Sequence, residues 1–96
     1  MAERKNYDQR LVDIGILLSN KRKALGPLYG NREKFIELRK EELFNSEDWI
    51  SNRHLTNIEL GKNMISIEKM ILLAAALETD PVELFKEIYE VYINKN

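Results

Sequence analysis

The sequence contains no cysteine, only one histidine, and few helix breakers: four glycines and two prolines in 96 residues. Without cysteine, the protein has neither a disulfide framework nor a thiolate metal site. The single histidine, His54, has no neighbouring nucleophile and no orienting acid that the sequence suggests. We therefore expect no catalytic residues and predict that the protein is not an enzyme.

Long apolar runs are also missing. The longest, Met70 to Leu77, is much too short to span a bilayer. The N-terminal segment MAERKNYDQR is charged and lacks the apolar centre of a signal peptide. The sequence also has neither a glycine-rich phosphate loop nor an acidic loop with the spacing of a cation site. We expect a cytoplasmic protein that needs no metal and no cofactor.

The apolar residues that are present are spaced as in helices, and strand-like alternation is absent. At this length, and with 44% hydrophobic residues, we expect residues 1–96 to form one small domain. An all-helical core, helped by dimerisation, suits this size better than a large sheet. The sequence therefore predicts an all-α domain.

Five helices are predicted from their start and stop signals. Capping residues are Asp8, Asn31, Ser51, Ser66 and Asp80, and each precedes a helical pattern. The expected helices lie near 8–25, from 31 to an interruption at 45–46, at 52–60, at 67–78, and from 81 towards the C-terminus.

Two apolar stripes are expected on the last two helices. In helix 67–78, the inward residues should be Ile67, Met70, Ile71, Ala74 and Leu77. In the C-terminal helix (81–96), the stripe should contain Val82, Phe85, Ile88, Tyr89 and Tyr92. The surplus in this helix, namely Ile88, Tyr89, Val91, Tyr92 and Ile93, either forms a dimer surface or completes the core of the monomer.

Charge is segregated along the chain although the net charge is only −1. The segment 19–40 carries a net charge of +5, 41–48 carries −4, and 78–96 carries −3. A near-neutral total argues weakly against a nucleic-acid partner, but local clusters create fields that distant acids do not cancel. The alternative is that these charges are ordinary solvated helix faces.

The third helix has the composition that a DNA-contacting helix needs. A helix-turn-helix protein sends small polar, amide or guanidinium groups into the major groove. Leu55 and Ile58 lie on the opposite side and should hold the helix on the core. Arginine pairs with two edges of guanine and asparagine with two edges of adenine. The polar side chains that share the outer face of helix 52–60 are Ser51, Asn52, Arg53, Thr56 and Asn57.

These residues resemble a known family. The segments IGILLSNKRKALG (14–26) and SNRHLTNIELGKNMISIEKMILLAAALETDPVELF (51–85) are similar to the Cro- and phage-repressor-like helix-turn-helix proteins, the XRE family. The second segment carries the Glu-x-Gly-Lys signature at 59–62. The resemblance implies a five-helix, lambda-repressor-like DNA-binding fold.

The resemblance also assigns roles to individual residues. It implies that Arg22 and Glu59 form a partly buried ion pair between the first and third helices. It implies that Gly61 makes the turn after the recognition helix, and that Lys62 and Asn63 lie where the loop touches a DNA phosphate.

The segment between the first and third helices departs from the family because it is longer. We align residues 31–36 with the start of the family's second helix, which puts Arg32 at a phosphate-contacting position. In an alternative alignment, the second helix starts near Lys40. The insertion at 37–50 should lengthen helix two and loop back, with Trp49 and Ile50 filling the core under the longer turn.

We therefore expect a single-domain transcriptional regulator, a repressor, that binds a palindromic operator in double-stranded DNA as a homodimer. The alternative is a protein-binding module or an antitoxin-type adaptor built on the same fold. The near-neutral charge, the acidic C-terminus and the insertion keep this alternative open.

Overall fold

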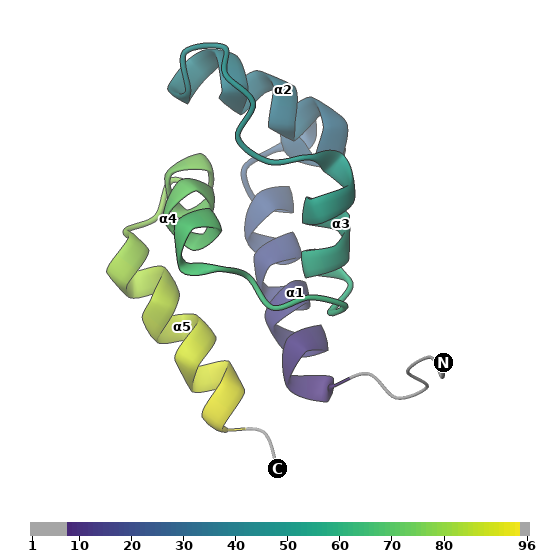
Figure 1. Ribbon diagram of the computed structural model, residues 1–96, viewed down its shortest axis with the longest axis vertical. Coiled ribbons are helices and arrows are strands. Elements are labelled where there is room, and N and C mark those ends of the chain that lie inside the picture. Colours follow the sequence, from purple (N-terminus) through teal and green to yellow (C-terminus); the bar gives the residue numbers. More distant parts are fainter. Residues whose placement is uncertain (1–7, 95–96) are drawn as a thin grey trace.

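The computed structural model describes residues 8–94, which fold into α-helices joined by short loops, with no strand in this range (Figure 1). The all-helical prediction is confirmed. The N-terminal segment on which the signal-peptide expectation rested lies largely outside the described residues. The elements are α1 (Gln9–Lys23), the short 3-10 helix η1 (Pro27–Tyr29), α2 (Arg32–Leu43), α3 (Asn52–Glu59), α4 (Ile67–Ala76) and α5 (Pro81–Ile93).

The helices begin where the capping residues predicted them. The side chain of each cap accepts a hydrogen bond from a first-turn backbone amide, at 3.0 Å for Asp8, Asn31 and Ser51 and at 3.1 Å for Ser66. Asp80 accepts two, from the amides of the second and third residues of α5. Each cap satisfies a donor that the helix itself leaves open.

The first helix lies between α3 on one side and α5 on the other, and α2 crosses above α3 (Figure 1). None of the helices in the described part of the chain is long and apolar enough to cross a membrane. The core draws residues from all five helices and from the segment before α3. Its buried apolar side chains are Ile14, Leu18, Phe35, Ile36, Trp49, Ile50, Leu55, Ile58, Met70, Leu73, Ala74, Ala76, Leu77, Leu84 and Ile88.

The close contact between α1 and α3 depends on two glycines. A Cβ on Gly15 would lie 2.3 Å from the carbonyl oxygen of Glu59, so only glycine lets the two backbones approach this closely. Gly61 has a φ of +79°, and a Cβ there would lie 2.6 Å from the Cα of Val12. Both contacts fix α3, and the loop after it, against α1.

The predicted inward face of α4 is partly wrong. Ile67 is 64% exposed and Ile71 is 50% exposed. The buried stripe of α4 instead follows Met70, Leu73 and Ala74. Ile67 and Ile71, one turn apart, therefore lie on a side of the domain that none of residues 8–94 covers.

The predicted stripe of α5 is also partly wrong. Leu84 and Ile88 are buried, whereas Val82, Phe85 and Tyr89 are 72%, 48% and 51% exposed. When a helix carries apolar residues on two faces, periodicity alone does not show which face is buried. The buried face depends on which helices pack against it.

The insertion extends α2, and the chain then reverses its direction. Asn45 and Ser46 both have positive φ values, 54° and 63°, and turn the chain back along α2 (Figure 1). Because α2 is one continuous helix from Arg32, the alternative alignment, in which the helix starts near Lys40, is not observed. The returning segment places Trp49 in the core, as expected, with 4% of the residue exposed.

One buried arginine that the sequence analysis did not single out joins α2 to the end of α4. Arg39 is 5% exposed and donates to the carbonyl of Ala76 at 2.9 Å and to the carboxylates of Glu42 and Glu78 at 2.9 and 2.7 Å. Burial lowers the pKa of Arg39, but the hydrogen bonds to Glu78 and Glu42 outweigh it and raise the pKa overall.

Replacing Trp49 with alanine should destabilise the domain by about 3–5 kcal/mol, because it leaves a cavity in the core. The Trp49 ring packs edge-on against Phe35 and close to Phe44, and its Nε1 donates to the carbonyl of Ile36 at 3.1 Å. Urea unfolding followed by circular dichroism measures the loss. Trp49→Phe, which keeps most of the volume, should lose clearly less; equal losses would contradict the packing role.

Candidate nucleic-acid interface

The third helix has one buried face and one open face. Leu55 and Ile58 are 0% and 1% exposed and pack into the core. Asn52 and Arg53, by contrast, are exposed, and Thr56 is half-buried beside them. Burial of the apolar pair therefore fixes the direction in which the polar side chains point.

The side chains of the open face have no partners inside the protein. Within residues 8–94, those of Asn52, Arg53, Thr56 and Asn57 form no hydrogen bond and no ion pair. Ser51 differs, because its hydroxyl is used to cap α3. The four unpartnered side chains present donors and acceptors to solvent, and no unpaired carboxylate from α3 lies among them.

The loop after α3 continues this surface. The backbone amides of Lys62 and Asn63 both approach the carbonyl of Asn57, at 2.8 and 3.4 Å, and so close the end of the helix. The side chains of Lys62 and Asn63 are exposed and form no hydrogen bond or ion pair with residues 8–94. A cation therefore stands at the C-terminal end of the open face.

A buried ion pair holds α3 on α1. The guanidinium of Arg22 donates two hydrogen bonds to the carboxylate of Glu59, at 2.8 and 2.9 Å, and both side chains are 2% exposed or less. Its remaining nitrogen donates to the carbonyls of Tyr29 and Gly30 at 2.9 and 2.7 Å. All the donors and acceptors that burial would otherwise leave unpaired are thus satisfied.

Arg32, which the alignment placed on a phosphate, also binds Glu59. Its Nε lies 2.7 Å from Oε1 of the carboxylate, and 31% of the side chain stays exposed. Glu59 therefore joins one buried and one half-exposed guanidinium. Two cations share one anion, so this cluster keeps a net charge of +1 at the start of α2.

Two hollows border the N-terminal end of α3, and their charges differ. One, of about 380 Å³, is lined by Arg22, Lys23 and Arg32 and by a single acid, Glu33, which also borders the other hollow. Lys23 was not among the residues predicted to contact DNA, although it belongs to the segment 19–40, whose net charge of +5 could have indicated it.

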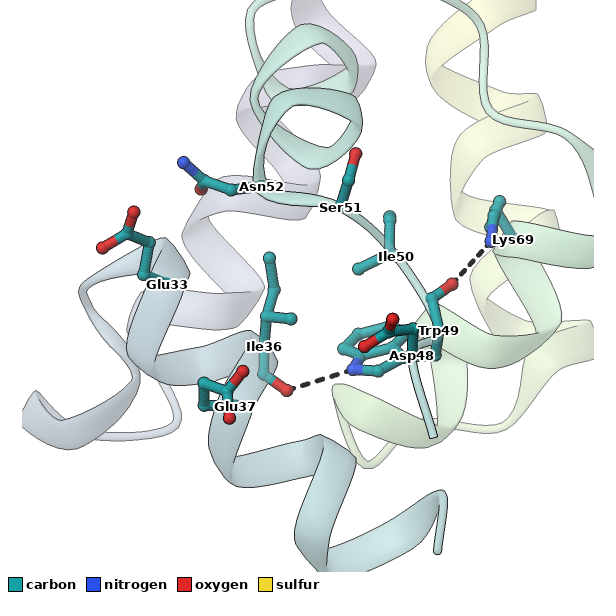
Figure 2. Close-up of a pocket in the computed structure, with 9 residues that line it drawn as sticks. All are labelled: Glu33, Ile36, Glu37, Asp48, Trp49, Ile50, Ser51, Asn52 and Lys69. Carbon is teal, nitrogen blue, oxygen red and sulfur yellow. Dashed lines mark hydrogen bonds between the residues drawn. The ribbon is translucent and has the colours of Figure 1, made fainter. Parts of the chain in front are cut away.

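The other hollow, of about 620 Å³, lies between α2 and the segment leading into α3 (Figure 2). In this hollow, Nε1 of Trp49 donates to the carbonyl of Ile36, and the carbonyl of Trp49 accepts a hydrogen bond from Lys69. Carboxylates line it: Glu33, Glu37 and Asp48. Asp48 lies 3.2 Å from Lys40, and this hydrogen bond raises the pKa of Lys40. An anionic ligand of α3 is therefore favoured on the Lys23 side and disfavoured on this side.

The capped polar helix α3 follows α2 through residues 44–51, a longer connection than the turn of about three to four residues in a typical helix-turn-helix. A family model described as helix-turn-helix matches residues 46–84, somewhat less than half of the chain. The match supports the resemblance of this segment to the Cro- and phage-repressor-like helix-turn-helix proteins, the XRE family.

The match covers α3, α4 and the start of α5, the second of the two segments that carry the resemblance. It begins at residue 46, so α1 and most of the insertion lie outside it. No curated protein and no solved structure matches the chain.

Replacing Glu59 with glutamine should lower the free energy of unfolding by about 3–5 kcal/mol, because it leaves the buried charge of Arg22 unpaired. Glu37→Gln is the matched control, since its pairing with Lys40 at 3.9 Å is exposed and should contribute less than about 1 kcal/mol. Urea unfolding of both variants measures the difference. Similar, small losses in the two variants would show that the buried pair contributes little.

Proposed function

We propose that this protein is a transcriptional regulator that binds double-stranded DNA sequence-specifically, with α3 in the major groove. The observation that supports this most directly is the open face of α3. It offers unpartnered amide, hydroxyl and guanidinium groups, while the only acid of the helix, Glu59, is buried and neutralised. A helix that served only as a scaffold would have no reason to keep this face polar and free of acids.

Base recognition follows from the chemistry of these side chains. Arg53 would donate to O6 and N7 of a guanine, and Asn52 or Asn57 would pair with N6 and N7 of an adenine. Thr56 lies one turn beyond Asn52, so its methyl and hydroxyl groups would contact the next base along. Ser51, whose hydroxyl caps the helix, would lie at its entry into the groove.

Contacts with the DNA backbone would flank α3 on both ends. Lys62 and Asn63 would contact a phosphate beyond its C-terminal end. At the other end, the cluster of Arg22, Glu59 and Arg32 retains a positive charge, and Lys23 lies beside it. The backbone amides and dipole at the start of α2 add to the attraction for a phosphate there.

One helix of this length contacts too few base pairs to select one site in a genome. We therefore propose that the protein acts as a homodimer on a palindromic operator, with no cofactor, in the cytoplasm where that DNA lies. Bound over a promoter, the dimer would repress transcription by excluding the polymerase.

The test is selection of a random double-stranded DNA library on the purified protein, followed by titration of the selected site by fluorescence anisotropy at several salt concentrations. A palindromic site with an affinity that falls steeply with salt is the expected result. Failure to enrich any sequence would contradict the proposal.

The alternative, a protein-binding module or antitoxin-type adaptor, is favoured by one feature. The insertion exposes Leu43 among the carboxylates of 41–48 and leaves it uncovered. A protein-binding module alone would show no enriched DNA site, whereas an antitoxin-type adaptor would bind both DNA and a partner. Either would lose its partner when Leu43 is replaced with aspartate.

Arg53→Ala and Asn57→Ala should each weaken binding to the selected operator by about 1–3 kcal/mol and relax the preference at one base position. Arg10→Ala is the control, because the guanidinium of Arg10 already pairs with Asp8 at 2.9 Å and lies over the ring of Tyr92. Selection repeated with each variant measures the preference. Wild-type affinity in both variants would mean that the base-contacting face is assigned wrongly.

Lys62→Ala should weaken binding to all sequences alike and reduce the slope of log affinity against log salt by about one unit, as expected when one phosphate contact is lost. Lys21→Ala provides the comparison, since its ammonium already pairs with Glu87 at 2.8 Å. Titrations at four or more salt concentrations give the slope. An unchanged slope would place Lys62 away from the phosphates.

A further inference from the structure

The second helix extends beyond the part of the core that it covers. Arg39 is the last buried residue of α2, and Leu43, one turn later on the same side of the helix, is 46% exposed. In Figure 1, the end of α2 and the turn after it lie above α4, at the end of α2 that is farther from α3. We call residues 43–48 the projection, because they stand out from the domain.

The projection is an ordered turn held by its own hydrogen bonds. The backbone amide of Ser46 donates to the carbonyl of Lys40 at 3.0 Å, and the hydroxyl of Ser46 donates to the carboxylate of Glu41 at 2.6 Å. Asn45 and Ser46 have positive φ values, a conformation that residues other than glycine rarely adopt. These bonds present the exposed side chain of Leu43 at a fixed place on the surface.

A hollow of about 370 Å³ lies between the projection and α4, and we call it the insertion hollow. Leu43 and Phe44 line it from the side of the projection, and Leu72 lines it from α4. Its volume is at the lower end of the roughly 300–1,000 Å³ of ligand sites. The insertion hollow therefore suits one or two side chains of a partner rather than a whole helix.

The insertion hollow also carries unpaired negative charge. Glu47 and Glu68 line it, and their side chains form no hydrogen bond and no ion pair within residues 8–94. Asp48 lines it too, but a lysine of α2 already lies 3.2 Å away. Among the described residues that line the hollow, the one cation is Lys69, whose ammonium donates to the carbonyl of Trp49. Two carboxylates are therefore left without a cation.

An arginine side chain matches both the apolar and the charged part of this surface. The stem of an arginine packs on apolar side chains while its guanidinium binds carboxylates, and its planar fork suits them better than the ammonium of lysine does. Leu43, at the edge of the hollow, would then contact an apolar side chain next to that arginine. Segment 41–48 carries a net charge of −4, so nucleic acids and anionic membranes are disfavoured here.

We propose that the insertion hollow is a docking site for a second protein, which pairs an arginine with Glu47 and Glu68 and packs a neighbouring apolar side chain on Leu43. The inference goes beyond the proposed function, because docking requires no DNA. The projection lies away from the open face of α3 in Figure 1, so one molecule holds the operator and the partner together. Leu43 and Phe44 precede residues 46–84, so the hollow depends on residues outside the segment that the family model matches.

Selection of a displayed library of random peptides on the purified full chain, without DNA, tests the proposal. The selected peptides should carry arginine beside an apolar residue, and the affinity of a labelled peptide, measured by fluorescence anisotropy, should fall with salt concentration. The same peptide with citrulline in place of arginine keeps its shape but loses the charge, and it should bind about tenfold or more weakly. A selection that yields no binders, or a citrulline peptide that binds equally well, would overturn the docking site.

Variants of the protein locate the binding site of the peptide. Leu43→Asp and Glu68→Lys should each weaken peptide binding by about tenfold or more, the scale of losing a central interface residue. Leu28→Asp is the control for the first, because Leu28 is 62% exposed on η1 and does not line the hollow. Glu83→Lys is the control for the second, because Glu83, like Glu68, is an exposed acid in the first turn of a helix. If circular dichroism shows that either variant is unfolded, Glu47→Lys replaces it.

Equal peptide affinities in the variants and their controls would overturn the assignment of the hollow. Sedimentation equilibrium without peptide tests whether the occupant is instead a second copy of the chain. A wild-type dimer that Leu43→Asp dissociates would assign the hollow to that copy and overturn the proposal.

Titration of the peptide into protein that is already bound to the selected operator tests simultaneous docking. Unchanged peptide affinity is expected, and loss of peptide binding would place the hollow inside the DNA interface and overturn the proposal. A protein that binds the peptide but selects no DNA would refute only the DNA-binding proposal.

Discussion

The hydrogen-bonded ion pairs of the buried Glu59 carboxylate are the interactions on which the arrangement of α1, α2 and α3 depends. This carboxylate accepts two hydrogen bonds from Arg22 on α1 and one from Arg32 on α2, so a single side chain of α3 fixes its own helix against two others. Arg22 then extends the network to the carbonyls of Tyr29 and Gly30 before α2. Because every polar atom is paired, the cost of burying the charges is offset, and α3 has one orientation relative to α2.

The same cluster determines the local charge around the proposed DNA surface. A net charge of −1 over the whole chain gives no sign of an anionic ligand. Pairing two guanidiniums with one carboxylate, however, leaves a positive charge at the start of α2, beside Lys23. The acids Glu37 and Asp48 lie on the other side of α3. A charge that is close and partly desolvated has more effect on a ligand than a distant solvated one.

The insertion and the last helix show how extra apolar residues are distributed. The chain reverses at Asn45 and Ser46, after the extended α2, and this reversal places Trp49 in the core. The Trp49 side chain fills the space under the longer turn. The additional apolar residues of α5 have no such space to fill. Leu84 and Ile88 are the buried residues of α5, with Val91 and Tyr92 packed beside the core, whereas Val82, Phe85 and Tyr89 remain outside.

The sequence by itself determined what depends on local chemistry. Caps such as Ser51 and Asp80 set the helix starts, because their side chains bond amides a few residues away, and the unpaired polar residues of helix 52–60 marked its open face. Only the tertiary structure decided which apolar face of α5 is buried, that Ile67 and Ile71 stay exposed, that Arg32 binds Glu59, and that Arg39 joins α2 to α4. These outcomes depend on which helices meet, and residues far apart in the chain, such as Arg39 and Ala76, carry no periodic signal of their meeting.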